Sequence, residues 1–417
     1  MTRLVAVSNR VAQPRGDPRS AGGLAVGVLA ALQEYGGVWF GWNGRTVHGE
    51  PGEAKIEQSG RITYATIDLN ERAYEMYYNG FSNTSLWPVC HYLLEHFRFD
   101  RREYDEYRRV NALFARKLIP LLQPDDVIWV HDYHLIPLAS ELRRAGVTQP
   151  IGFFLHVPFP DVGMLRVLPV YRQIIRALCS YDVVGFHTPR DLRSFNEAVA
   201  QQDIGGLLQA DRRIKAPERI VKADVFPIGI DVDSCRSLAN EAQSSPSVER
   251  MVEHLHSRDL VIGVDRLDYS KGLLERFRAF ERLIENYPAN RNKVSYIQIA
   301  PTTRSGVRAY AEIREALEQL AGRINGKFAD IDWVPIRYLN RAFDRATLMG
   351  FFQNARIGLV TPVRDGMNLV AKEFVAAQDP DDPGVLVLSE LAGAADELTE
   401  ALLVNPYDID AVADALH

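Results

Sequence analysis

The sequence has 417 residues, of which 47% are hydrophobic and 24% charged, and its 48 basic and 54 acidic side chains give a formal net charge of −6. This composition excludes wholesale disorder, and the interspersed charges exclude a basic stripe for nucleic acid or a polybasic run for anionic membranes. No apolar run approaches the roughly 18 residues that cross a bilayer, and the length exceeds one hydrophobic core, so we expect two domains.

In the first half of the chain, short apolar runs bounded by turn residues predict the strands of a sheet. The runs are hydrophobic throughout rather than alternating, which is typical of strands covered on both faces in a parallel sheet. Helical patterns lie between them. The expected strands are RLVAVSN (3–9), DVIWVHD (126–132), IGFFLHV (151–157), DVVGFHT (182–188) and VFPIGI (225–230).

The second half repeats this alternation. In residues 271–288, apolar side chains from Leu273 to Ile284 recur every three or four positions with charges opposite, which predicts an amphipathic helix. Two more helices are expected near 305–321 and 367–378, and alternating strands and helices indicate α/β layers. The expected strands are LVIGVDR (260–266), VSYIQIAP (294–301), DWVPIRYL (332–339), ARIGLVTP (355–362) and GVLVLSE (384–390).

The stretch from 228 to 250 is the most polar and small-residue-rich segment between the two series of strands. It places a domain boundary near residue 235. We therefore expect two Rossmann-like, doubly wound domains, residues 1–235 and 236–417, that face each other across a cleft. Open α/β sheets bind ligands beyond the carboxyl ends of their strands, so motifs that follow strands carry most of the functional weight.

Gly22 and Gly23 precede an apolar helix in the first half. Glycine lets a backbone approach a ligand closely, and the N–H groups at a helix start suit a phosphate. The alternative is a purely structural tight turn, which fits these residues equally well.

Histidines and an aspartate follow two strands of the first half. His131, Asp132 and His134 come after one strand and His156 after the next. These side chains suit sugar hydroxyls, the orientation of a reacting hydroxyl, or a metal. The metal is the least favoured because no zincin-like spacing accompanies them. A hydrogen-bonded core residue is the alternative for each histidine taken alone.

Cations follow two strands of the second half. Arg266 and Lys271 suit a diphosphate, because arginine grips oxygens as a fork and lysine acts as a point charge. A solvated surface pair is the alternative. Arg304 follows another strand and can reach an anionic group, although an exposed arginine is the simpler interpretation.

The segment RDGMNLVAKEF (364–374) reads as the entrance of a helix. Asp365 and Gly366 stand at that entrance, where outward N–H groups suit an oxygen-rich ligand. Glu373 lies about two turns further on the same side, where its carboxylate can accept paired ribose hydroxyls. A capped surface helix is the alternative for the segment alone.

Cys90, Cys179 and Cys235 are far apart and odd in number. This spacing disfavours a disulfide framework or a structural zinc site and fits a reducing compartment. Together with the lack of a membrane-length apolar run, it leads us to expect a cytoplasmic protein.

A collinear series of motifs from residue 3 to about 408 resembles the trehalose-6-phosphate synthases, which are retaining glycosyltransferases of the GT-B fold. That family joins glucose from UDP-glucose to glucose 6-phosphate without a metal or another cofactor. The resemblance implies a first domain that binds the acceptor and a second that binds the nucleotide sugar. The motifs are LVAVSNR, SAGGLAVG, WFGW, YYNGFSN, LWPVCHY, WVHDYHLIP, IGFFLHVPFP, DRLDYSKG, IAPTTR, AGRINGKF and RDGMNLVAKEFVAAQ.

The resemblance implies a pocket for the acceptor, glucose 6-phosphate. Trp87 and Val157 are implied to influence which anomer is accepted, and Trp42 to wall the pocket. The acceptor-binding residues implied by position are Arg10, Trp42, Tyr78, Trp87, Asp132 and Arg304.

The resemblance also implies the donor site. Arg266 and Lys271 would hold the diphosphate, Phe343 would meet the uridine through its main chain, and Glu373 would bind the ribose. Asp132, His156, Arg266, Lys271 and Asp365 are the implied catalytic residues. The implied donor-binding residues are Gly22, Gly23, His156, Arg266, Lys271, Phe343, Asp365, Gly366, Met367, Asn368, Leu369, Val370, Ala371, Lys372 and Glu373.

The implied mechanism proceeds on one face of the sugar through an oxocarbenium-like ion pair, while the leaving phosphate takes the proton of the acceptor hydroxyl. A double displacement is the alternative, but no motif supplies an obvious nucleophile. A glucosylglycerol-phosphate synthase, or a related transferase with another phosphorylated acceptor, is the alternative function. A nucleotide-linked oxidoreductase and a catalytically silent sugar-phosphate sensor are more distant alternatives. The nucleotide preference stays open, as does a homo-oligomer, either dimer or tetramer.

Overall fold

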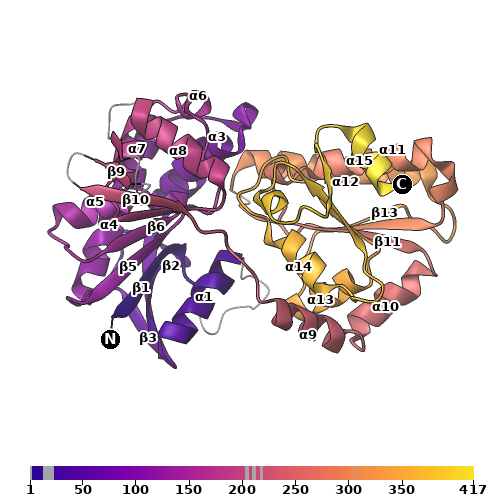
Figure 1. The fold of residues 1–417 in the computed structure, drawn as a ribbon, viewed down its shortest axis with the longest axis horizontal. Helices are drawn as coiled ribbons and strands as arrows, with labels where there is room; N and C mark the ends of the chain where they lie inside the picture. The colour runs from indigo at the N-terminus through magenta and orange to yellow at the C-terminus, as the bar shows by residue number, and fades with distance from the viewer. Residues whose placement is uncertain (1, 13–22, 202–205, 209–212, 217–218, 305) are drawn as a thin grey trace. The chain divides into compact units, whose positions relative to one another are not determined.

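The chain forms two compact α/β units, each built on its own mostly parallel sheet (Figure 1). The computed structural model describes residues 2–12, 23–201, 206–208, 213–216, 219–304 and 306–417. Within these residues the first unit ends at Ile228 and the second runs Gly229–His417. The boundary expected between residues 235 and 236 falls within a helix of the second unit, Val232–Ala242.

The sheet of the first unit has the strand order β3-β4-β2-β1-β5-β6-β7-β10-β9-β8. Neighbours from β4 to β10 are parallel, and antiparallel strands join at the two edges. The order reverses direction between β1 and β5, which makes that point a ligand-binding position in a doubly wound fold. The strands are β1 (Arg3–Arg10), β2 (Gly37–Val47), β3 (Lys55–Ser59), β4 (Ile62–Asn70), β5 (Asp126–His131), β6 (Ile151–Phe154), β7 (Val183–Phe186), β8 (Gly206–Leu208), β9 (Arg213–Lys215) and β10 (Ile220–Val225).

Helices of three kinds connect these strands. The segment η2 is π-helical and kinked at Gly80, and such segments are frequent at functional sites. The α-helices are α1 (Gly23–Tyr35), α2 (Glu71–Ala73), α3 (Trp87–His91), α4 (Arg101–Leu118), α5 (Leu138–Arg144), α6 (Val162–Leu165), α7 (Tyr171–Leu178) and α8 (Pro189–Gln201); the π-helix is η2 (Tyr74–Leu86), and the 3-10 turns are η3 (Leu94–His96), η4 (Ile119–Leu121) and η5 (Tyr133–Leu135).

The sheet of the second unit is parallel throughout, in the order β13-β12-β11-β14-β15-β16. This is the Rossmann order, and it reverses direction between β11 and β14. The strands are β11 (Asp259–Val264), β12 (Val294–Ile299), β13 (Ile336–Leu339), β14 (Ile357–Val360), β15 (Val385–Ser389) and β16 (Leu402–Val404).

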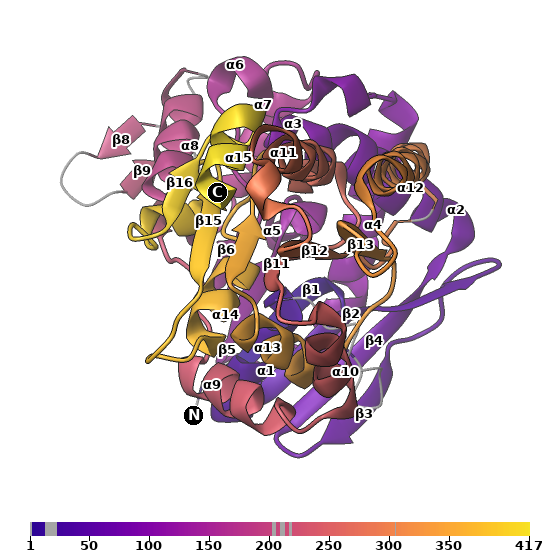
Figure 2. The ribbon, with the colours of Figure 1, turned by 90° about the vertical axis from the view of Figure 1, so that its right-hand side faces the viewer.

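The helices of the second unit cover both faces of its sheet. Figure 1 shows α11, α12 and α15 on one face and α9, α13 and α14 on the other. Figure 2 shows α15 beside α11, and the Tyr287 hydroxyl donates to Asp414 at 2.7 Å between them. The helices are α9 (Val232–Ala242), α10 (Pro246–Leu255), α11 (Leu273–Asn286), α12 (Arg308–Phe328), α13 (Arg345–Gln353), α14 (Leu369–Ala377) and α15 (Ile409–Leu416); the 3-10 turns are η6 (Tyr269–Lys271), η7 (Pro288–Asn290) and η8 (Gly393–Asp396).

Most of the predicted strands are confirmed, and one prediction is wrong. The run 225–230 is not a strand, because β10 ends at Val225 and the chain continues without regular structure. Pro227 cannot donate to a ladder, so a central strand cannot run through it. Pro335 has the same effect in the run 332–339, of which only β13 is extended. The helix expected over 305–321 is longer at its carboxyl end, since α12 reaches Phe328.

The three cysteines, Cys90, Cys179 and Cys235, are free and buried. Burial raises the pKa of the Cys179 thiol to about 12, so this side chain packs as a neutral group. In the described part of the chain, no helix has both the length and the apolar character needed to cross a membrane. Those residues also contain no group of three or more His, Cys, Asp or Glu side chains placed to hold a metal ion.

Candidate functional site

Asp132 occupies the switch point of the first unit, directly after β5. Its φ of 76° is unusual for a residue other than glycine. Its N–H donates to the carbonyl of Phe154 at 2.8 Å, and its Oδ1 accepts from the backbone N–H of His156 at 3.1 Å. The carboxylate is thereby fixed between the ends of β5 and β6.

Three imidazoles gather beside Asp132. His131 Nδ1 and His156 Nε2 lie 3.1 Å apart, and the His187 ring meets the His156 ring edge-on at 5.5 Å. Burial lowers the pKa of His131 to about 3. Burial, and then the neighbouring His131 and His187, hold the pKa of His156 well below its ordinary value. His131 and His156 are therefore neutral at pH 7 and act as hydrogen-bonding groups rather than as charges. His131 and His156 were predicted from the sequence as candidate site residues, whereas His187 was not.

Several of the residues implied for the acceptor lie in a group of neighbouring aromatic side chains. The Arg10 guanidinium lies 5.9 Å from the centre of the Trp42 ring, and Trp42 lies 6.2 Å from Tyr78. Tyr78, in the π-helical η2, stacks between Tyr74 at 5.4 Å and His134 at 5.5 Å. The Arg10 side chain is exposed. The structure thus brings Arg10, Trp42 and Tyr78 together, and it adds Tyr74, which the sequence analysis did not identify.

Other sequence-predicted residues of the first unit lie deeper in it. The Trp87 ring stacks on His91 at 4.1 Å and faces Tyr133 at 5.6 Å. Val157 is buried directly after His156. Gly22 lies outside the described residues, and Gly23 is the first residue of α1.

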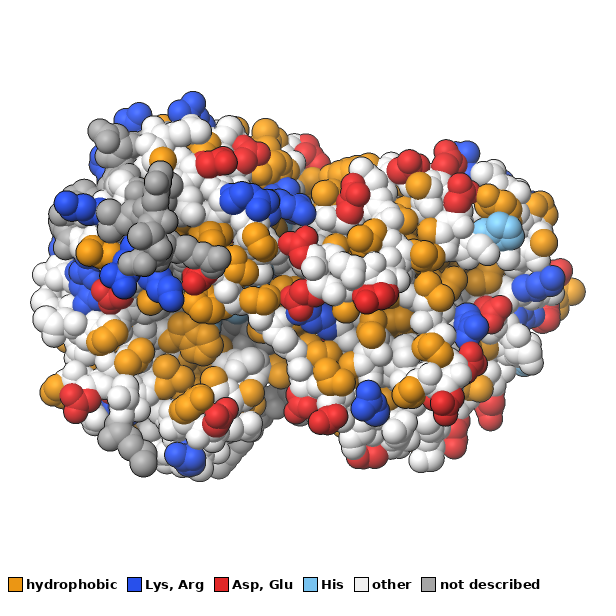
Figure 3. All heavy atoms as spheres, in the orientation of Figure 1, with side chains coloured by type: hydrophobic (Ala, Val, Ile, Leu, Met, Phe, Trp, Pro, Cys, Tyr) orange, Lys and Arg blue, Asp and Glu red, His pale blue; other side chains and the backbone are white. Residues whose placement is uncertain are grey.

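A cavity of about 450 Å³ opens in the first unit between α1 and the strands β5, β6 and β7. Its walls are mostly apolar, with His131 and His156 among them. Hydrophobic side chains also gather on the face of this unit drawn in Figure 3. The side of the imidazoles that faces this cavity is therefore apolar, which agrees with burial as the main cause of the lowered pKa values of His131 and His156.

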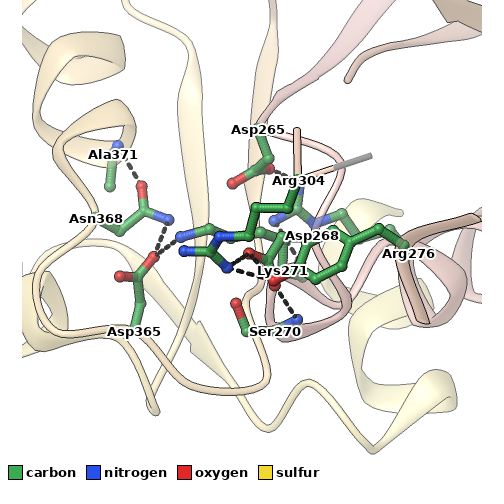
Figure 4. A network of polar contacts seen from close by, with 10 residues as sticks. Asp265, Asp268, Ser270, Lys271, Arg276, Arg304, Asp365, Asn368 and Ala371 are labelled. Carbon is green, nitrogen blue, oxygen red and sulfur yellow. Dashed lines mark hydrogen bonds and ion pairs between the residues drawn. The ribbon is translucent and has the colours of Figure 1, made fainter. Parts of the chain in front are cut away.

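The switch point of the second unit is a network of charged groups (Figure 4). The Lys271 ammonium forms an ion pair with Asp365, and Asn368 Nδ2 donates to Asp365 Oδ2 at 3.1 Å. Asn368 Oδ1 accepts from the N–H of Ala371 at 3.3 Å and caps α14. The helix therefore starts at Leu369, two residues after the start expected near residue 367, and the Asp365 carboxylate before it is turned to Lys271.

Arg276 of α11 braces both loops of this switch point. Its Nη1 donates to Asp265 at 2.5 Å, its Nη2 to the carbonyl of Lys271 at 3.0 Å, and its Nε to the Thr361 hydroxyl at 3.1 Å. The side chains of Arg276 and Asp265 are 0% and 2% exposed. The amphipathic pattern placed the charges of this helix opposite its buried stripe, and for Arg276 that prediction is wrong because the guanidinium has buried acceptors.

The loops after β11 and β14 touch directly at Gly272. Its φ is +65°, and a Cβ added there would lie 2.3 Å from the carbonyl oxygen of Thr361. The Val363 N–H donates to the carbonyl of Ser270 at 3.0 Å nearby. Only glycine permits this approach, which brings Lys271 and Asp365 within reach of each other.

The two remaining predicted arginines differ in exposure. The Arg266 side chain is exposed after β11. Arg304 is turned inward, and its Nη1 donates to Asp268 Oδ2 at 3.0 Å (Figure 4). Asp268 was not singled out from the sequence, although two acidic residues flanking a cation in DRLD are a usable signal, because acids beside an anion site need partners of their own.

Glu373 lies on α14 beside Arg345 of α13. Arg345 Nε is 3.4 Å from Glu373 Oε1, and Arg345 Nη2 is 3.2 Å from the Cys235 sulfur. Burial raises the pKa of the Glu373 carboxyl, and Arg345 opposes that shift. The Glu373 side chain is 22% exposed, so a ligand can reach its carboxylate.

The other residues predicted for the donor site lie in and around α14. The Lys372 ammonium lies 2.9 Å from both carboxylate oxygens of Glu397, and Met367 is buried. The Phe343 ring lies under the Arg341 guanidinium at 4.6 Å. Gly366 and Met367 belong to the loop before α14, and the first turn of that helix contains Leu369, Val370 and Ala371.

Comparison with known proteins finds similarity along both units. The sequence profile of glycosyltransferase family 20 matches residues 9–417. Trehalose-6-phosphate synthase of Klebsiella pneumoniae is 51% identical over 420 aligned positions, which span 100% of this chain and 87% of that protein.

Two solved structures of similar proteins contain ligands. The alpha,alpha-trehalose-phosphate synthase (UDP-forming) from Burkholderia xenovorans in complex with glucose-6-phosphate has a TM-score of 0.96 and 53% identity, covering 99% of this chain and 91% of that one. The Escherichia coli protein bound with UDP-2-fluoro glucose has a TM-score of 0.93 and 49% identity, covering 100% and 90%.

Proposed function

We infer that this chain, which belongs to glycosyltransferase family 20, transfers glucose from UDP-glucose to glucose 6-phosphate. The products are α,α-trehalose 6-phosphate and UDP, and the enzyme is a retaining glucosyltransferase of the GT-B fold. The observation that carries this conclusion is the 53% identity and TM-score of 0.96, across 99% of the chain, to a UDP-forming synthase that holds glucose 6-phosphate.

We propose that the second unit binds the donor at the β11/β14 switch point. Lys271 and the exposed Arg266 supply positive charge for the diphosphate, and the positive dipole end at the start of α14 adds to it. Glu373, kept near Arg345 at 3.4 Å, is placed to accept the ribose hydroxyls. We assign the uridine to Phe343.

We propose that residues of the first unit bind the acceptor sugar. Asp132 offers a fixed carboxylate for sugar hydroxyls, and Trp42 and Tyr78 offer ring faces beside the exposed Arg10. Arg304 is the proposed ligand of the acceptor phosphate. Trp87 and Val157 are the proposed determinants of anomer choice, and the assignment of residues 1–235 to the acceptor and 236–417 to the donor is part of the same proposal.

The reaction exchanges one bond for another at the anomeric carbon of the donor glucose. The bond from that carbon to the β-phosphate oxygen breaks, a bond to the anomeric hydroxyl oxygen of glucose 6-phosphate forms, and the proton of that hydroxyl passes to the departing phosphate. Negative charge grows on UDP, so Arg266 and Lys271 stabilise the transition state more than the ground state. A neutral His156 cannot supply a proton at pH 7, so we assign it a hydrogen bond to the transferred glucose.

The test of this function is the identity of the product. Purified protein with UDP-glucose and glucose 6-phosphate is expected to release UDP and a phosphorylated disaccharide, identified by mass spectrometry, with both anomeric centres α by NMR. Parallel reactions contain ADP-glucose or GDP-glucose as donor, or glycerol 3-phosphate as acceptor. Faster turnover with glycerol 3-phosphate than with glucose 6-phosphate would overturn the assignment of the acceptor.

We also propose where and in what state the enzyme works. Its two substrates are charged phosphorylated sugars that do not cross bilayers unaided, which favours the cytoplasm. A dimer or tetramer is the proposed assembly, and light scattering coupled to size-exclusion chromatography measures it directly.

A further inference from the structure

Arg304 is held by a closed ring of hydrogen bonds. Its Nη1 donates to Asp268 Oδ2 at 3.0 Å and also to the Tyr310 hydroxyl, and that hydroxyl donates to the same Asp268 oxygen at 3.1 Å. The Arg304 guanidinium also lies over the Tyr310 ring, 5.4 Å from its centre. The side chains of Arg304 and Asp268 are 4% and 0% exposed, so water does not compete for these bonds.

The ring of hydrogen bonds joins loops that follow two different strands. Asp268 stands before the turn η6, after β11, and its Oδ1 accepts from the N–H of Ser270 at 3.0 Å. Arg304 lies in the loop after β12, and Tyr310 is in the first turns of α12. The backbone of Arg304 has a φ of 47°, a left-handed conformation that costs free energy in any residue except glycine. Such a conformation persists where surrounding contacts over-determine it, as the ring does here.

The ionisation of the ring members permits only one arrangement of its hydrogens. Burial alone would raise the pKa of Asp268, but the charges of Arg304 and Arg266 hold it below its ordinary value. Burial raises the pKa of Tyr310 well above its ordinary value. Asp268 is therefore an acceptor, Tyr310 donates to it, and the guanidinium cannot rotate without breaking two bonds.

We propose that Asp268 and Tyr310 are positioning residues that set the affinity of the enzyme for the phosphate group of its acceptor by fixing the guanidinium of Arg304. This inference rests on the proposed function, in which Arg304 binds that phosphate. An arginine grips a phosphate through two parallel N–H bonds, so its plane must be oriented, and an arginine that is already oriented loses less entropy on binding.

Two physical effects of Asp268 oppose each other. Its negative charge weakens the attraction between Arg304 and a phosphate, whereas its hydrogen bond fixes the guanidinium. Replacing the carboxylate by an amide therefore strengthens acceptor binding if charge dominates and weakens it if positioning dominates. The sign of the change in KM for glucose 6-phosphate separates the two.

The experiment compares Tyr310→Phe and Asp268→Asn with the matched control Glu281→Gln. Glu281 is a carboxylate on α11 that does not belong to the hydrogen-bonded ring. Its Oε2 lies 2.6 Å from Arg323 Nη2. We expect Tyr310→Phe, which loses one hydroxyl, to raise KM for glucose 6-phosphate about threefold to tenfold, and Asp268→Asn to raise it more. The KM for UDP-glucose is expected to stay within about twofold of the unmodified enzyme for Tyr310→Phe, because Arg266 and Lys271, the proposed ligands of the donor diphosphate, are unchanged.

Three results would overturn the proposal: an unchanged KM for glucose 6-phosphate in both variants, a lower one in Asp268→Asn, or an equal rise in both KM values for Tyr310→Phe. The last result indicates a merely structural role. If Asp268→Asn does not fold, Tyr310→Phe decides alone, because phenylalanine fills the same buried space.

Arg304→Ala distinguishes this inference from the function beneath it. A KM for glucose 6-phosphate unchanged in Arg304→Ala shows that this arginine does not bind the acceptor phosphate, and both proposals about it fall. A KM raised in Arg304→Ala but not in Tyr310→Phe or Asp268→Asn overturns the positioning role and leaves the phosphate role of Arg304 standing.

Discussion

Both units have a switch point at which the strand order reverses, but the side chains at the two switch points differ in kind. Beside the switch point between β1 and β5, the Asp132 carboxylate lies next to the neutral imidazoles of His131 and His156 and near stacked rings. Between β11 and β14, the Asp265–Arg276 and Lys271–Asp365 ion pairs surround the ends of the strands. The fold therefore decides where a ligand binds, and the side chains decide which ligand it is. Rings and hydroxyl-binding groups suit a sugar, whereas fixed cations suit a diphosphate.

The largest expected effect tests whether buried charge supports the second switch point. Arg276→Met leaves Asp265 buried without its partner, so we expect the free energy of unfolding to fall by about 3–5 kcal/mol in a urea titration. The matched control is Arg323→Met, which removes a half-exposed arginine and is expected to cost at most about 1 kcal/mol. Equal losses in the two variants would show that the buried pair contributes no more than a surface one.

The next effect separates charge used for catalysis from charge used for stability. Arg266 is exposed, so Arg266→Ala is expected to keep the Tm of the unmodified enzyme while kcat falls about 10²- to 10³-fold. The control is Arg278→Ala, which removes a half-exposed arginine on α11. It is expected to leave kcat unchanged. Turnover near normal in Arg266→Ala would remove this residue from the diphosphate site.

Acid is expected to destabilise the first unit through its buried histidines. The pKa of His131 is about 3 in the folded chain and about 6.5 when unfolded, so the unfolded chain takes up the proton first as pH falls. Stability is therefore full above pH 6.5 and declines by about 1.4 kcal/mol per pH unit, per histidine, as pH falls toward 3.

The measurement is the slope of unfolding free energy against pH between 6 and 5. We expect this slope to be smaller in His131→Gln than in the unmodified protein by about 1.4 kcal/mol per pH unit, because the unfolded variant takes up about one proton fewer. His254→Gln, at an exposed position on α10, is the control and is expected to keep the full slope. An undiminished slope in His131→Gln would mean that acid acts elsewhere in the chain.

The smallest effect concerns the stacked rings. Tyr74→Leu removes one partner of Tyr78, and an aromatic pair contributes about 0.5–1.5 kcal/mol, so KM for glucose 6-phosphate is expected to rise about twofold to tenfold. The KM for UDP-glucose is expected to stay constant. Tyr35→Leu, at an exposed position on α1, is the control. A comparable rise in both KM values would show that the rings do not serve the acceptor alone.

The sequence was sufficient for the central strands and for most strand-end residues. Strands such as β1 and β11 are buried on both faces and therefore appear as unbroken apolar runs. The strand β2 was missed because Gly37, Gly41 and Gly44 interrupt its run, and glycine ordinarily weakens a strand. The register there depends on close approach of β1, since a Cβ at Gly41 would lie 2.1 Å from the carbonyl of Ser8.

The partners of the predicted site residues could not be found from spacing. Arg276 occupies a helical position that resembles a solvated one, and only the folded loops show that its acceptors are buried. Tyr74 and Tyr310 resemble ordinary core aromatics, and their stacking and hydroxyl bonds depend on tertiary contacts. Local patterns thus identify the residues that follow a strand, whereas the residues that orient them come from other elements.

The contact at Gly272 has a consequence for how this protein tolerates change. Any side chain at that position would strike the Thr361 carbonyl, and its left-handed backbone would be strained as well. A saturation mutational scan should therefore find position 272 intolerant while exposed neighbours such as Arg278 accept many amino acids. Homologous recombination that exchanges the two loops between relatives should succeed only when they are inherited together, because their backbones interlock without a side chain between them.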